Sequence, residues 1–183
     1  MNLLMDLFNK RSSVRNYQEC PVEREKVLQC LEAARLAPSA HNGQPWRYII
    51  VDDPKLKDEL CSAAFSGIFS LNKYAKTAPV IVVVLARPDF VANKIGAMVV
   101  GLQFYLLDIG ASIEHFLLCA AHLGLGACWL GWFSEARIRA LLKIEKKDKI
   151  VSLISLGYPR EESSGEKDRK SIEEISSFNS YKP

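Results

Sequence analysis

The spacing of apolar and polar residues along the chain predicts a series of short helices and strands. Apolar positions three and four apart favour helices over residues 3–10, 22–36, 54–64, 108–122 and 135–142. Continuous apolar or β-branched runs favour strands over residues 46–51, 80–85, 127–133 and 150–156. Helices and strands alternate irregularly, so this pattern by itself leaves α+β and mixed α/β folds both open.

Three residues mark the boundaries of the predicted helices. Pro38 disfavours helix in the residue before it, so the helix over residues 22–36 is expected to end there. Gly124 is suited to end the long apolar helix, and Ser134 is a suitable N-cap for the next one. Residues 39–45 are therefore expected to form a loop between a helix and a strand.

The end of the chain differs in character from the rest. Beyond Pro159 the sequence is polar and charged up to residue 170, and Ile172, Ile175 and Phe178 then return as apolar positions. We interpret residues 160–183 as an arm that packs on a partner subunit, and a frayed terminus is the alternative. Residues 1–183 contain no evident repeat and are predicted to form a single domain.

Composition is typical of a globular protein. Hydrophobic residues make up 49% of the 183 residues and charged residues 25%, which is enough for a core and disfavours disorder. The net charge of +3 is too small to indicate nucleic-acid binding. The five cysteines include no C-x-x-C pair, and His115 and His122 lack a third ligand at suitable spacing. We therefore predict neither a disulfide framework nor a metal site.

The N-terminus lacks the basic start and apolar core of a secretion signal. The most apolar region, residues 104–133, is interrupted by Asp108, Glu114 and His115, which would be rare together in a membrane helix. We interpret this region as buried protein. A cytoplasmic location with reduced thiols and no membrane partner is expected.

Two basic clusters lie near opposite ends of the chain. They consist of Arg11 and Arg15 at one end, and of Lys167, Arg169 and Lys170 at the other. Arginine offers forked donors that match phosphate oxygens, and the hydroxyls of Ser12 and Ser13 add further donors. Isolated charges of this kind are more often solvated surface groups.

Two loops are further candidates for ligand contact. In residues 37–46, Asn42 and Gln44 carry donors and acceptors that suit the edge of a uracil-like ring, although a rigid, self-satisfied turn is the alternative. The segment from Gly124 to Trp132 contains a G-x-G sequence, but Trp129 stands where a dinucleotide-binding fingerprint has its third glycine, and the segment follows a helix and enters a strand, the reverse of the required order. Its glycines are instead expected to let the backbone approach a flat ligand closely.

Taken together, four segments resemble the FMN-dependent nitroreductase family. They are residues 11–15, 34–46, 108–126 and 156–159, in that order, and the resemblance spans nearly the whole chain. It implies an α+β fold with a central mixed β-sheet wrapped by helices. It also implies an intertwined homodimer with flavin mononucleotide (FMN) sites at the interface.

The resemblance assigns roles to individual residues. Arg11, Ser12 and Ser13 would hold the phosphate and ribityl end of FMN, and the late pair Lys167 and Arg169 would complete the phosphate site. The positions assigned to the ring are Arg15, Pro38, Ser39, Ala40, Asn42, Gln44, and the backbone of Leu130 and Gly131. Ser12 stands where the family often has arginine, and His115 where it often has an amide; Asn72 and Lys73 are further candidates for the pyrimidine edge.

The implied function is a flavin oxidoreductase. NADH or NADPH would pass hydride to FMN, and an electron-poor small molecule such as a nitroaromatic or quinone would then take its place in a ping-pong reaction. No catalytic side chain is predicted, because the cofactor carries the chemistry. A cation such as Arg15 would favour the negative charge that reduction places near flavin N1. The alternatives are reductive dehalogenation, flavin fragmentation, a flavin-binding protein without turnover, and a basic-patch module that binds no flavin.

Overall fold

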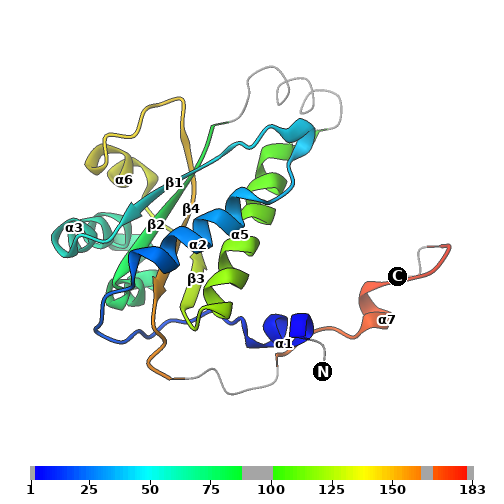
Figure 1. Ribbon diagram of the computed structural model, residues 1–183. Helices are drawn as coiled ribbons and strands as arrows, with labels where there is room; N and C mark the ends of the chain where they lie inside the picture. The colour runs from blue at the N-terminus through cyan, green and yellow to red at the C-terminus, as the bar shows by residue number, and fades with distance from the viewer. Residues whose placement is uncertain (1–2, 88–100, 162–166, 181–183) are drawn as a thin grey trace.

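The computed structural model describes residues 3–87, 101–161 and 167–180. Its centre is a four-stranded sheet with the strand order β1-β2-β4-β3 (Figure 1). The strands are β1 (Trp46–Val51), β2 (Val80–Ala86), β3 (Gly126–Leu130) and β4 (Lys149–Gly157). All three pairings between them are antiparallel. The predicted α+β class is confirmed. A mixed sheet was expected, and in the described residues the one parallel pairing is an isolated bridge between Ser13 and Ala127.

Helices cover both faces of this sheet. On one face lie α2 (Arg24–Arg35) and α5 (Phe104–His122), and on the other lie α3 (Pro54–Ala64), α6 (Glu135–Leu141) and the 3-10 segment η2 (Gly67–Thr77). The helix α5 begins four residues before its predicted start, and β3 ends at Leu130 rather than at residue 133. The segment η2 has no counterpart in the sequence prediction. Ser134 occupies the N-cap position of α6 without a side-chain hydrogen bond.

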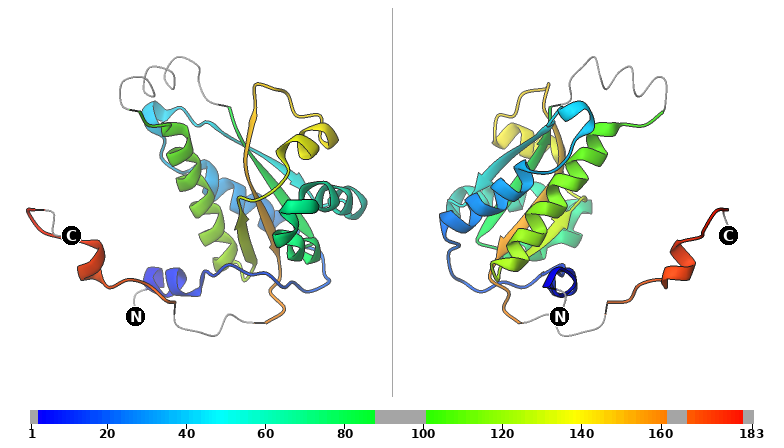
Figure 2. Two further views of the ribbon diagram at one scale, coloured as in Figure 1. Left: turned by 180° about the vertical axis from the view of Figure 1, so that it is seen from behind. Right: turned by 45° about the vertical axis from the view of Figure 1, so that its right-hand side comes forward.

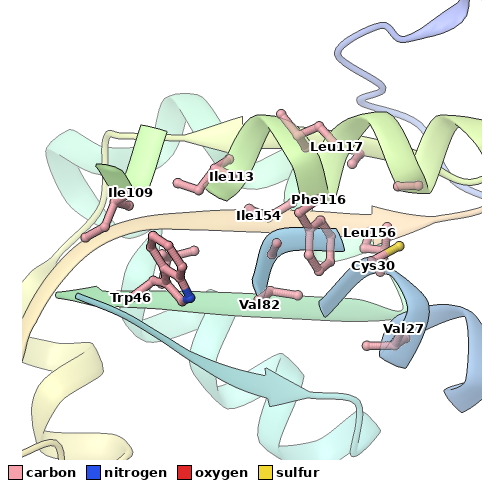
Figure 3. Close-up of a cluster of buried hydrophobic side chains, with 14 of the residues drawn as sticks. Val27, Cys30, Trp46, Val82, Ile109, Ile113, Phe116, Leu117, Ile154 and Leu156 are labelled. Atoms are coloured by element: carbon pink, nitrogen blue, oxygen red, sulfur yellow. The ribbon is translucent and has the colours of Figure 1, made fainter. Parts of the chain in front are cut away.

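The core therefore has two halves, separated by the sheet. Every residue of β2 is buried, as its apolar run predicts, and its side chains alternate between the two halves. Figure 3 shows the half beneath α2 and α5, where side chains from the helices cover those from the strands. The labelled residues include Cys30, Ile113 and Phe116 from the helices, and Val82, Ile154 and Leu156 from the strands.

The apolar character of α5 follows from its place in this core. By length and composition it is long and apolar enough to cross a membrane. Here Ile109, Ile113 and Phe116 are fully buried against the sheet. Core packing thus accounts for the apolar residues on this face of the helix.

The two ends of the chain leave apolar side chains exposed. In α1 (Leu3–Lys10) these are Leu3, Leu4, Met5 and Phe8. The short helix α7 (Ile172–Ile175) projects away from the sheet in all three views, with Ile172, Ile175 and Phe178 exposed (Figures 1 and 2). Residues 172–178 thus extend as an arm whose apolar side chains the described part of the chain leaves exposed.

Candidate functional site

The segment after α1 runs along the free edge of β3. Val14 N donates to the carbonyl oxygen of Ala127 at 3.0 Å. A glycine at position 126 is required for this approach, because a Cβ there would lie 2.6 Å from Val14 Cγ2. Gly124, with a φ of +78°, ends α5 as predicted. The absence of a side chain at Gly126 thus makes room for the side chain of Val14.

Tyr17 anchors the far end of this segment to the central strand β4. Its side chain is 1% exposed, and its hydroxyl donates to the carbonyl oxygen of Val14 at 2.7 Å and lies 2.7 Å from Ser155 Oγ. Burial raises the pKa of Tyr17, so the phenol remains a neutral hydrogen-bonding group. Residues 14–17 are consequently held against the sheet at both ends.

The two basic clusters meet at the start of this segment. Lys167 Nζ donates to the carbonyl oxygens of Arg11 and Phe8. Burial and the nearby positive charges of Arg11 and Arg169 lower the pKa of Lys167. Glu114, 3.7 Å from Arg11 Nε, supplies one negative charge. Three cations near one carboxylate favour the binding of a further anion.

A cavity of about 380 Å³ adjoins this cluster. Lys10, Arg11 and Ser12 line part of it, Gly126 and Ala127 of β3 line another part, and Leu117 and Ala121 of α5 also contribute. It is thus bounded by basic and hydroxyl side chains, by the edge of the sheet and by apolar side chains of α5. Ser13 forms the bridge to Ala127, and Arg169 is exposed and donates to the carbonyl of Asp168.

The other end of β3 is open to solvent. Leu130 is buried, whereas Gly131 is exposed and a Cβ built on it would meet no heavy atom within 4 Å. The segment η2 is tied to this end, because Asn72 Nδ2 donates to the carbonyl oxygen of Trp132 at 2.9 Å and Trp132 Nε1 donates to Ile68 at 3.0 Å. The amide of Asn72 is thereby held by protein, and Lys73 is exposed.

The loop containing residues 38–44 lies away from the Arg11 segment in the structure. It sits at the N-terminal end of α5, where Ala40 N donates to Asp108 Oδ1 at 3.0 Å, and it leads into β1. In Figures 1 and 2 it lies at one end of α5 and α1 lies at the other. Since β1 and β3 are opposite edges of the sheet, they are separated by three strand spacings, roughly 14 Å. Within one chain, the predicted site is therefore divided into two groups.

The polar groups of this loop bond to one another. Ser39 Oγ accepts from Gln44 N at 3.0 Å, and Gln44 Nε2 donates to the carbonyl oxygen of Asn42 at 3.1 Å. His41, Asn42 and Gln44 all have positive φ, a conformation that non-glycine residues seldom adopt. Pro38 and Ala40 are exposed beside them. The loop is thus a rigid, self-bonded turn with strained backbone, a combination that recurs at ligand sites.

Comparison with known proteins identifies the family. The sequence profile of the nitroreductase family matches residues 9–158. The chain belongs to the nitroreductase family. It is similar to an NADH dehydrogenase of Thermus thermophilus, with 31% identity over 84% of this chain and 85% of the relative. The family and such relatives make it an oxidoreductase.

Two further proteins are similar to this chain over most of its length. A 5,6-dimethylbenzimidazole synthase of Rhodospirillum rubrum is 27% identical over 85% of this chain and 82% of its own length. An FMN-dependent nitroreductase of Clostridium difficile has a solved structure that superimposes with a TM-score of 0.78. That alignment has 28% identity and covers 97% of this chain and 99% of the other. The fold is that of a nitroreductase.

Two residues that the sequence left without a role, His115 and Cys128, make structural contacts. His115 Nδ1 lies 3.2 Å from the carbonyl oxygen of Ala33, so it joins α5 to α2. Cys128 is buried in β3, with its sulfur 3.5 Å from the hydroxyl of Tyr74. The ring of Tyr74 lies beneath the guanidinium of Arg15. Tyr74 was not among the candidate residues predicted from the sequence, which in this segment were only Asn72 and Lys73.

Proposed function

We propose that this chain is an FMN-dependent oxidoreductase that uses NADH or NADPH to reduce electron-poor small molecules such as nitroaromatics or quinones. The observation that carries the proposal is the meeting of Lys167 with Arg11 and Arg169 beside a cavity on the edge of β3. One terminal phosphate matches this set of cations. The absence of a dinucleotide fingerprint in the sequence favours FMN over a larger flavin.

The residues present fit such a cofactor. Arg11, Lys167 and Arg169, together with the hydroxyls of Ser12 and Ser13, would hold the phosphate and the ribityl chain. Arg15 lies farther along the same segment and would face the ring. The open space beside Gly131 allows a flat group to approach the backbone at the end of β3. FMN, when bound, supplies the site that accepts and donates hydride.

The protein's own part in the reaction is binding and electrostatics. Basic side chains near the cavity would stabilise the doubly charged phosphate. Arg15 would provide positive charge toward the ring, which would favour the reduced cofactor. The exposed end of β3 would be the side from which the nicotinamide and then the oxidant approach, as a ping-pong reaction requires. No side chain needs to act as a nucleophile.

The division of the predicted site supports a homodimer. Residues 38–44 lie at the sheet edge opposite β3, so we propose that this loop of one copy completes the flavin site of the other. The exposed apolar side chains of α7 and Phe178 supply a surface for the partner to cover. Phe178 is 87% exposed in the single chain. A dimer would bury these groups and unite the two halves of the site.

A visible absorption spectrum of the purified protein tests the proposal. We expect a flavin spectrum that bleaches on anaerobic addition of NADH or NADPH and returns with a nitroaromatic or a quinone. Heat release followed by chromatography should give FMN. A colourless protein that refuses added FMN would contradict the proposal, and a yellow protein that neither nicotinamide reduces would indicate a flavin carrier.

A specialised reaction of the same cofactor is the second candidate. The likeness to the Rhodospirillum rubrum 5,6-dimethylbenzimidazole synthase covers 85% of this chain, so fragmentation of the flavin itself deserves a direct test. Reduced protein exposed to oxygen should be analysed for benzimidazole products by mass spectrometry. Their formation at the expense of FMN would favour this candidate over a reductase.

A further inference from the structure

Arg15 lies in surroundings that differ from those of the other arginines near the site. Its guanidinium carbon is 5.8 Å from the centroid of the Tyr74 ring, within the range of a cation–π contact. Over residues 3–87, 101–161 and 167–180, no carboxylate forms an ion pair with it. The Tyr74 hydroxyl also raises the pKa of Arg15. The orientation of this exposed cation therefore depends on one aromatic side chain.

Tyr74 is itself held firmly. Its hydroxyl lies 3.5 Å from the sulfur of Cys128, which is buried in β3. Thr77 Oγ1 donates to the carbonyl oxygen of Tyr74 at 2.8 Å. The segment η2 that carries Tyr74 is joined to the end of β3 through Asn72 and Trp132. A ring fixed in this way lowers the conformational entropy that the flexible Arg15 side chain would lose on binding a ligand.

We propose that Tyr74 is a positioning residue, whose ring holds the Arg15 guanidinium toward the pyrimidine side of the flavin while Cys128 holds the Tyr74 hydroxyl. The inference rests on the proposed FMN function and adds a residue that neither the family resemblance nor the sequence identified. Arg15 favours the reduced cofactor only when its charge is oriented toward the ring. Tyr74 thereby influences both FMN affinity and the reduction potential.

The test compares Tyr74→Leu, Tyr74→Phe, Arg15→Ala and the double variant Tyr74→Leu with Arg15→Ala. We expect Tyr74→Leu and Arg15→Ala each to weaken FMN binding by about 3- to 10-fold, the range of a cation–π contact. If reduced FMN loses tenfold more affinity than oxidised FMN, the midpoint potential falls by about 30 mV for a two-electron couple. Tyr74→Phe keeps the ring and should keep most of both properties.

Coupling between the two residues distinguishes positioning from a general loss of stability. If Tyr74 acts through Arg15, the double variant should be no worse than Arg15→Ala alone. In the apoprotein, the NMR resonance of the Arg15 side-chain N–H should lose its ring-current shift in Tyr74→Leu and keep it in Tyr74→Phe. Tyr158→Leu is the control, since Lys26 Nζ lies 4.8 Å from the centroid of the Tyr158 ring and also donates to its hydroxyl, and neither residue lines the cavity. It should leave the potential unchanged.

The outcomes separate this proposal from the proposed function. A wild-type protein that binds no FMN would overturn both. If wild type binds FMN and Tyr74→Leu leaves affinity and potential unchanged, or if the effects of Tyr74→Leu and Arg15→Ala add, only the role of Tyr74 is overturned. A lower midpoint potential in Tyr74→Leu, with a potential near that of wild type in Tyr74→Phe, would support it.

Discussion

Lys167 donates a hydrogen bond from Nζ to the main-chain carbonyl oxygen of Arg11, although the two residues lie 156 positions apart in the sequence. The contact joins the two basic clusters next to a cavity that Arg11 lines. Like charges repel one another, so such a cluster is most stable when an anion binds it.

Replacing Arg11 or Arg169 with alanine should weaken FMN binding far more than it weakens folding. Each removes a charge-assisted contact to phosphate, worth about 1.5–3 kcal/mol. FMN titrations of the apoproteins, alongside their melting temperatures, measure the two effects separately. Arg160→Ala is the control, because Arg160 is exposed and only loosely paired with Glu19 at 3.7 Å. Unchanged FMN affinity in both variants would show that these arginines are solvated surface charges with no part in binding.

Gly126→Ala and Gly131→Ala should have opposite consequences. A Cβ on Gly126 overlaps Val14, so this substitution should lower the free energy of unfolding by about 1–3 kcal/mol and disturb the phosphate segment. A Cβ on Gly131 meets open space, so that variant should keep its stability and lose FMN affinity. Urea unfolding and FMN titration separate the two. Restored stability on adding Val14→Gly to Gly126→Ala would confirm the overlap as the cause.

Tyr17→Phe should destabilise the protein without removing any group that would contact the cofactor. The buried hydroxyl bonds the carbonyl of Val14 and lies beside Ser155 Oγ, and its loss leaves the partly buried Val14 carbonyl and the buried Ser155 hydroxyl without this partner. The expected cost is about 1–3 kcal/mol. Thermal unfolding of the apoprotein measures it. A variant as stable as wild type would show that the anchor at residue 17 contributes nothing.

Acid should weaken the protein partly through Asp148. Its carboxylate accepts two hydrogen bonds from Arg87, at 2.7 and 2.8 Å, and its side chain is 8% exposed. The contact with Arg87 lowers the pKa of Asp148, so its contribution is present above the unfolded pKa and lost as pH falls through the folded one. Asp148→Asn should cost about 1–2 kcal/mol at pH 7.

The same variant should also flatten the acid branch of the stability curve. Urea unfolding at a series of pH values from 7 downward measures this, with the exposed Asp52→Asn as control. If Asp148→Asn and wild type lose stability in parallel below pH 4, another carboxylate is responsible.

Truncation after Pro159 should abolish FMN binding and dimer formation together. It removes Lys167, Arg169 and the exposed apolar residues of the arm in one step. Because FMN would bind only the assembled state, it should stabilise the dimer. Light scattering combined with flavin absorbance across a chromatography peak measures both properties. A yellow, soluble monomer would show that the arm is not part of a shared site.

Local sequence patterns determined the elements of this protein well. The apolar run of β2 predicted a strand buried on both faces, and residues 46–51 and 54–64 form a strand and a helix with the predicted bounds. In the second case Asp53 accepts from Leu56 N and Pro54 begins the helix. The four segments that resemble the nitroreductase family, found in the same order along the chain, also predicted the α+β class. Each of these features depends on residues that are neighbours in the chain.

Tertiary structure alone decided which distant residues meet. The strand order β1-β2-β4-β3 places the 38–44 loop and the Arg11 segment at opposite edges, which no local periodicity encodes. Tyr74 lies in a 3-10 segment with no strong pattern, and only the packing of that segment on β3 brings its ring to Arg15. Periodicity reports which side of an element is buried, whereas partners are selected by how whole elements pack.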